Sequence, residues 1–250
     1  MHKISVLITI VLIAFQVSAQ QFVSKGTIEF EVITNVKKTM GNNSFDEQLK
    51  ELMPTFKTAY YNYTFADNKS IFKFDRYDEK KAKLPEFLKR DEDINEWYSD
   101  FSTGLTYMQK NIWGSPINFK DSITSIQWKL SNESRMIAGF NCRKATGKIM
   151  DSVYVFAFYT DEITISGGPC SINGLPGMIM GVTIPRLYMS MLATKVNVSD
   201  VKESTIKPIV VKKYYTNKEI KIMLDKRIES FTISDEDKKY IDQMYWNTLL

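Results

Sequence analysis

The chain has 250 residues, of which 44% are hydrophobic and 25% charged; this is too apolar for a disordered protein and enough to form a folded core. Its formal charge is +4 at pH 7, and the basic and acidic residues are interspersed, so no basic stripe for binding nucleic acid is expected. A long apolar run occurs only at the N-terminus, which argues against a transmembrane protein.

Residues 1–19 have the pattern of a secretory signal peptide. Lys3 gives a basic start, an apolar stretch covers residues 4–15, and small residues precede a cleavage site after Ala19. The apolar stretch is shorter than the ~20 residues of a spanning helix, so a retained anchor is the weaker interpretation. We therefore expect residues 20–250 to form a single periplasmic or secreted domain.

Histidine occurs once, as His2 in the predicted signal peptide. The mature chain would have no imidazole for a catalytic triad, a His-ligated metal or general base catalysis. An enzyme would have to use other groups, such as Asp161 or Glu162 with Lys144. Adjacent residues on a strand face opposite sides, so Asp161 and Glu162 cannot act together on one bond, and a non-catalytic function is favoured.

The first part of the mature chain predicts strands and one short helix. Residues 26–36 alternate between apolar and polar side chains, which is the period of a half-buried strand. A capping box at 44–47 begins a short helix that Pro54 ends. Residues 55–66 and 70–77 are then predicted to form a hairpin. Residues 78–93, which are mostly charged, are predicted to form an exposed loop.

The middle of the chain predicts a meandering antiparallel sheet, because short alternating segments are separated by turn signals. Residues 153–159 are apolar on both sides, which predicts a central strand covered on both faces. The predicted strands are residues 96–101, 105–110, 123–130, 140–150, 153–160, 177–184 and 187–198.

The chain ends in two predicted amphipathic helices, which begin with capping signals at Thr216 and Ser234. No linker or repeat separates them from the strands, so we expect them to pack on the sheet. The predicted fold is α+β and β-dominated: a curved, partly rolled antiparallel sheet with C-terminal helices packed on it.

Two cysteines occur, Cys142 and Cys170. Thiols outside the cytoplasm are commonly oxidised, so we expect these two to form a disulfide. Because the spacing is not that of a CxxC motif, a redox couple or soft-metal site is the weaker alternative.

The most specific motifs lie between residues 139 and 184: GFNCRKAT at 139–146, FYTDEI at 158–163 and GLPGMI at 174–179. They resemble the GLPGLI family of secreted envelope proteins of Gram-negative bacteria, with Met178 in place of the motif's second leucine. The resemblance implies an exported protein, and the family has no established reaction.

Two interpretations of the GLPGMI segment remain open. One is a rigid structural corner, because glycine accepts positive φ and proline fixes its own φ. The other is a loop at the mouth of a concave sheet that contacts an apolar ligand or a partner strand. The candidate contact residues are Gly174, Leu175, Pro176, Gly177, Met178 and Ile179.

Sulfur-containing residues are concentrated near Cys170, and thiolate and thioether groups can hold cuprous copper without histidine. Packing is the simpler explanation, since methionine fills irregular cores. The candidate copper ligands are Cys170, Met178, Met180, Met189 and Met191. The preferred function is an exported, non-catalytic binding or adaptor protein without a cofactor, which holds a lipid-like ligand or docks on an envelope protein.

Overall fold

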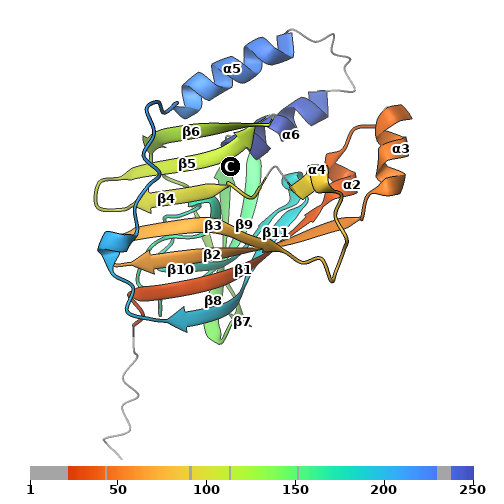
Figure 1. Ribbon diagram of the computed structural model, residues 1–250. Coiled ribbons are helices and arrows are strands. Elements are labelled where there is room, and N and C mark those ends of the chain that lie inside the picture. The colour runs from red at the N-terminus through yellow and green to blue at the C-terminus, as the bar shows by residue number, and fades with distance from the viewer. Residues whose placement is uncertain (1–21, 43, 90–91, 113, 151, 230–237) are drawn as a thin grey trace, which may run out of the picture.

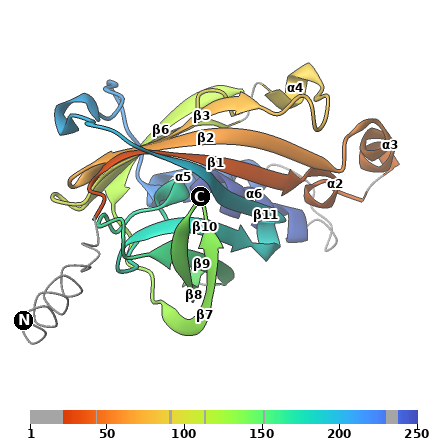
Figure 2. The same cartoon turned by 90° about the horizontal axis from the view of Figure 1, so that it is seen from below.

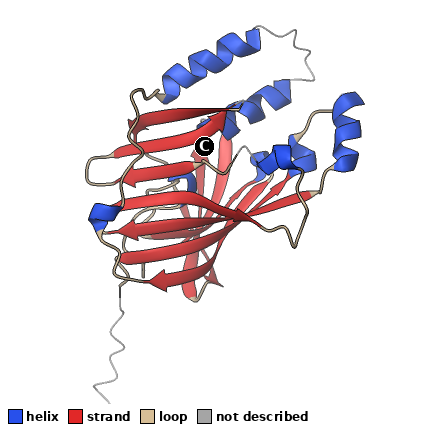
Figure 3. Ribbon diagram, viewed as in Figure 1, coloured by secondary structure: helices blue, strands red, loops and turns tan. Residues whose placement is uncertain are grey.

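The computed structural model describes residues 22–250 except residues 43, 90–91, 113, 151 and 230–237. The predicted signal peptide lies outside the described residues. Within them, the strands form one antiparallel sheet in the order β6-β5-β4-β3-β2-β1-β11-β10-β9-β8-β7, with helices packed beside it (Figures 1 and 3). The predicted fold class is confirmed.

The strands, in chain order, are β1 Lys25–Asn35, β2 Phe56–Ala66, β3 Lys69–Tyr77, β4 Glu96–Asp100, β5 Leu105–Ile112, β6 Ser115–Ser122, β7 Lys129–Ile137, β8 Phe140–Ile149, β9 Val153–Thr160, β10 Met178–Ile184 and β11 Met189–Val198. The α-helices are α2 Val36–Thr39, α3 Ser44–Leu52, α4 Glu86–Lys89, α5 Asn217–Glu229 and α6 Lys238–Leu249, and the short 3₁₀ helices are η1 Pro169–Ser171, η2 Pro185–Leu187 and η3 Glu203–Thr205.

The sheet is open but strongly bent, so that β7–β10 lie beneath β1–β3 in Figure 2. Its two edge strands, β6 and β7, are consecutive along the chain. Residues 123–128 connect them and can span at most ~25 Å when extended. The two edges of the sheet therefore lie near each other, as a partly rolled sheet requires.

The core lies on the inner face of this bend. In β1 the alternation places Ile28, Phe30 and Val32 on that face, where they are buried as predicted. The segment 161–177 between β9 and β10 packs against the same face: a side chain added at its Gly167 would meet the Tyr63 hydroxyl at 2.1 Å. Other residues of this segment are buried there, namely Ile163, Ile165, Ile172 and Leu175.

Four local predictions differ from the structure. The sequence predicts a turn at Pro116, but this residue lies in strand β6. Because β6 is at the edge of the sheet, it tolerates a proline, which cannot donate a backbone hydrogen bond. Residues 123–128, predicted to begin a strand, have no regular structure and cross between the sheet edges. In β9 the outer face is only partly covered, since Tyr154 is 57% exposed while Phe156 and Phe158 are half-buried. The charged region 78–93 contains the short helix α4 and the buried Leu84.

The capping box predicted for the first C-terminal helix is present. The Thr216 amide donates to the Glu219 carboxylate at 2.7 Å, and the Glu219 amide donates to the Thr216 hydroxyl at 3.2 Å. The predicted start of the second helix at Ser234 lies outside the described residues. Helix α6 packs beside α5 and η2, where Gln243 donates to the Arg186 carbonyl.

None of the described helices has both the length and the apolar character needed to cross a membrane.

Candidate functional site

A cavity of about 920 Å³ lies between the inner face of the sheet and the two C-terminal helices. Its wall is formed by β4–β6, residues 123–127, the end of β8, the η1 segment, α5 and α6. Small-molecule sites in proteins usually have volumes of ~300–1,000 Å³. The cavity is therefore large enough for a ligand of several tens of atoms, and it is the candidate site of this molecule.

One side of the cavity wall is apolar. Strands β4–β6 contribute Trp97, Met108 and Phe119, which the alternation of each strand points toward the helices and which are nearly fully buried. The facing apolar residues come from the η1 segment and from α6: Ile172, Trp246 and Leu249. This side suits an apolar part of a ligand.

The other side of the wall is polar and ties α5 to the sheet. The Asp121 carboxylate accepts a hydrogen bond of 3.0 Å from the Asn217 amide, at the start of α5, where a negative charge is favourable. The Tyr245 hydroxyl of α6 donates to Asp225 of α5; burial, and then this carboxylate, raise the pKa of Tyr245. The remaining charged residues of the wall are Lys148, Lys221 and Asp242.

A half-buried cation lies beside the apolar wall. Lys110 follows Thr106 and Met108 on the inner face of β5, and its ammonium group lies 5.7 Å from the centre of the Trp97 ring. Burial lowers the pKa of Lys110 to about 8, against the opposing effect of Cys170 and Glu92. Among the lysines that the structure describes, only Lys110 has a pKa that burial lowers below its usual value.

The backbone beside the cavity is strained at two consecutive residues. Cys170 and Ser171 have φ angles of 52° and 57°, which non-glycine residues rarely adopt. Ser171 and Thr106 both line the cavity. The Ser171 hydroxyl lies 3.1 Å from the Thr106 hydroxyl, and this contact ties the turn to β5. The strained turn positions the Cys170 thiol at the cavity wall.

The predicted disulfide is wrong, because both cysteines are free. The Cys142 thiol faces the core from β8, beside the Phe140 carbonyl and Arg135. The Cys170 thiol lies in the η1 segment against Met191 of β11. Burial raises the pKa of each thiol to about 12. The two thiols have different neighbours, which their spacing in the sequence did not reveal.

The GLPGMI corner packs into the core. Leu175, Met178 and Ile179 are at most 1% exposed, whereas Gly174 and Pro176 are exposed. None of the six candidate contact residues of this corner lines the cavity.

The backbone of this corner explains its glycines. Gly174 and Gly177 have φ angles of +90° and +127°, and a side chain at Gly177 would meet the Thr160 carbonyl oxygen at 2.0 Å. The Trp128 indole donates to the Asn173 carbonyl at 2.9 Å and holds the start of the turn. The arrangement is the rigid turn expected from the sequence, and whether it also contacts a partner stays a prediction.

The structure brings two of the five candidate copper ligands into contact: the Cys170 and Met191 sulfurs are 3.9 Å apart. Met178 and Met180 are fully buried in the core. Within the part of the chain that the structure describes, no three side chains of histidine, cysteine, aspartate or glutamate gather as a metal site.

The carboxylates considered for an enzyme lie away from the cavity. Asp161 pairs with Arg143 at 2.8 Å, and the Asp161 side chain is 63% exposed. Glu162 accepts a hydrogen bond of 3.3 Å from the Asn141 amide. Lys144 pairs with Glu133 at 2.6 Å, so these groups do not converge on one pocket.

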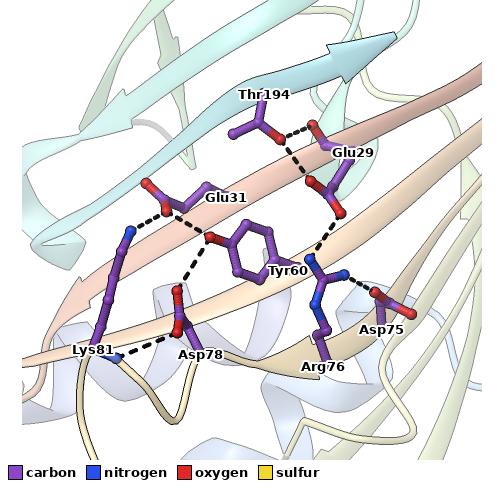
Figure 4. A network of polar contacts seen from close by, with 8 residues as sticks. All are labelled: Glu29, Glu31, Tyr60, Asp75, Arg76, Asp78, Lys81 and Thr194. Carbon is purple, nitrogen blue, oxygen red and sulfur yellow. Dashed lines mark hydrogen bonds and ion pairs between the residues drawn. The ribbon is translucent and has the colours of Figure 1, made fainter. Parts of the chain in front are cut away.

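A separate charged cluster covers the outer face of β1–β3 and β11 (Figure 4). Tyr60 donates to Glu31 at 3.0 Å and Arg76 donates to Glu29 at 3.0 Å; burial, and then Glu31, raise the pKa of Tyr60 to about 12. Thr194 adds a hydrogen bond of 2.9 Å to Glu29. Each of these groups has a partner across the strands, so the cluster binds the sheet together.

Sequence reasoning missed the cavity and Lys110. One signal was present: in 105–110 the lysine falls on the face shared by Thr106 and Met108, an apolar position for a charged residue. Residues 123–127 and α6 also line the cavity. Their part in it depends on contacts between segments far apart in the sequence, which no local sequence pattern indicates.

Comparison with known proteins gives a short family match and a fold. Residues 147–181 match the model of a family described as a protein of unknown function, Porph_ging. No curated protein matches the chain.

The solved structures that are similar to the chain include two of PNGF-II. The structure in space group P21 has a TM-score of 0.50 and 12% identity, and the match covers 80% of this chain and 33% of that chain. The structure in space group C2 has a TM-score of 0.44 and 12% identity, covering 89% and 33%. The chain thus spans about a third of the PNGF-II chains, and at this identity the first likeness shows the fold alone.

Proposed function

We propose that this protein is an exported, non-catalytic binding protein of the cell envelope, of the GLPGLI type, which holds an apolar or amphipathic small molecule. The observation that carries the proposal is the cavity of about 920 Å³, with an apolar wall from the sheet and a polar wall from α5. An apolar pocket with a few polar groups is the usual form of a small-molecule site.

The family segment supports the same site. Residues 147–181, which match the family of unknown function, include Lys148 and Ile149 at the end of β8, Met150 after it, and Cys170 and Ser171 of η1. These five residues contribute to the cavity wall. The pattern of residues 1–19 is that of a signal peptide, which supports a binding site that acts outside the cytoplasm.

Binding of N-phenylnaphthylamine, a neutral apolar fluorophore, tests the proposal. The half-buried Ile149 lines the cavity, so Ile149→Trp adds a ring within the space that a ligand would occupy. We expect saturable fluorescence enhancement with the native protein and at least ~10-fold weaker binding to Ile149→Trp, since a filled cavity excludes the probe.

The matched control is Leu192→Trp, which adds the same ring on the outer face of β11, where Leu192 is 38% exposed. This variant should bind the probe as the native protein does. Equal binding to all three proteins, or no saturable binding to the folded native protein, would refute a ligand site in the cavity.

A second candidate is binding of cuprous copper, favoured by the distance of 3.9 Å between the sulfurs of Cys170 and Met191 beside the cavity. Competition of the reduced protein with bicinchoninate for cuprous copper tests it. Cys170→Ser and Met191→Leu should each weaken binding at least ~10-fold, while Met178→Leu should not. Copper binding unchanged in Cys170→Ser eliminates this candidate.

A further inference from the structure

Lys110 is an unusual group in this fold because it is half-buried on the inner face of the sheet without an acidic partner. No carboxylate of the described residues lies within ion-pair distance of its ammonium group. Glu92, whose charge acts on Lys110, is paired with Lys57 at 2.5 Å. A cation that is partly withdrawn from water without a counter-charge is unfavourable, so the position of Lys110 beside a cavity requires an explanation.

The end of α6 covers Lys110 and a second donor. The Lys110 ammonium group donates to the Asn247 carbonyl in the last turn of α6. The Trp97 indole donates to the main-chain oxygen of Leu250 at 2.8 Å. Two donors thus converge on main-chain oxygens at a helix C-terminus, the partly negative end of the helix dipole.

These donors lie at the apolar end of the cavity. Trp97, Met108, Cys170 and Leu250 line the cavity, and the Lys110 ammonium group lies 5.7 Å from the centre of the Trp97 ring. A molecule that entered along the apolar wall would meet the Trp97 and Lys110 donors once the last turn of α6 moved aside. The chemistry that matches a cation and an N–H donor side by side is a carboxylate.

Resting on the proposed function, we infer that the ligand is a long-chain carboxylic acid. Its carboxylate binds Lys110 and Trp97 in place of the main-chain oxygens of Asn247 and Leu250, and its chain lies along Met108, Phe119 and Ile172. The last turn of α6 acts as a displaceable cover, because the contacts that it loses at these two donors are replaced by those of the ligand.

The test compares laurate with dodecanol, which has the same chain and no charge. Calorimetric titration of the native protein should give an affinity for laurate at least ~10-fold higher than for dodecanol, since a charge-assisted hydrogen bond is stronger than a neutral one. Lys110→Met should reduce this ratio to ~1 and leave the affinity for dodecanol unchanged. Trp97→Phe, which keeps Lys110, should reduce the ratio severalfold.

Lys148→Met and Lys221→Met are the controls, because Lys148 and Lys221 are the exposed lysines of the cavity wall. They should keep the laurate preference. Loss of the preference in either of them would place the carboxylate at the wall and overturn the inference. Equal affinities of the native protein for laurate and dodecanol would also overturn the inference, although the cavity would remain a ligand site. If the native protein bound neither probe, the proposed function itself would be refuted.

Discussion

Gly177 shows how a single residue fixes the corner after the long β9–β10 segment. Its φ of +127° and the closeness of the Thr160 carbonyl leave no room for a side chain. Gly174, three residues earlier, also has positive φ, but a side chain there would meet only Trp128 at an ordinary contact distance of 3.6 Å. The two glycines of one motif therefore carry different constraints.

Gly177→Ala should lower the free energy of unfolding by ~3 kcal/mol or more, since it adds a steric clash to the strain of positive φ. Gly174→Ala, with the strain alone, should lower it by ~1 kcal/mol. Urea denaturation of both variants measures the difference. Equal losses would contradict the packing of this corner.

The two cysteines give a second prediction at the scale of residues. Because both thiols are free, the protein denatured without reductant should react with two equivalents of a thiol reagent. In the folded protein both should react slowly, since burial raises the pKa of each thiol to about 12 and little thiolate forms near neutral pH. If the denatured protein reacts with the thiol reagent only after reduction, the two cysteines form a disulfide and the prediction of free thiols is wrong.

At the scale of single elements, α6 is held to the sheet by donors from β4 and β5. Trp97→Phe removes the indole that binds the Leu250 oxygen and should speed hydrogen exchange of the last amides of α6. Trp128→Phe is the matched control, because it removes an indole that binds the Asn173 carbonyl instead.

Exchange measured by mass spectrometry should rise in α6 for the Trp97 variant and near Asn173 for the Trp128 variant, each loss costing ~1 kcal/mol of local stability. Faster exchange of α6 in both variants, or in neither, would show that these indole contacts do not hold the segments separately.

Most strands could be predicted because a half-buried strand has a two-residue period. Residues 26–36 show that period, and β1 runs over nearly the same residues. Strand β6 could not be predicted, because Pro116 is compatible with pairing only at a sheet edge, and edge position is a property of the whole sheet. The same holds for 123–128, whose course is set by the two edges that it joins.

At the scale of the whole molecule, the bend of the sheet determines the site. The 161–177 segment fills one part of the inner face, and the helices α5 and α6 cover another part and leave the cavity. Sequence reasoning predicted a curved sheet with helices on it, but it placed the candidate contacts at 174–179. Those residues are mostly buried, and the cavity depends on contacts between segments far apart in sequence.

Native mass spectrometry of the protein isolated without detergent from its own cells shows whether the cavity holds a small molecule. We expect a mass excess that an organic solvent removes, that proves to be an amphipathic molecule, and that is absent from Ile149→Trp. Native protein whose mass equals that of the bare mature chain, and which takes up neither N-phenylnaphthylamine nor laurate, would contradict it.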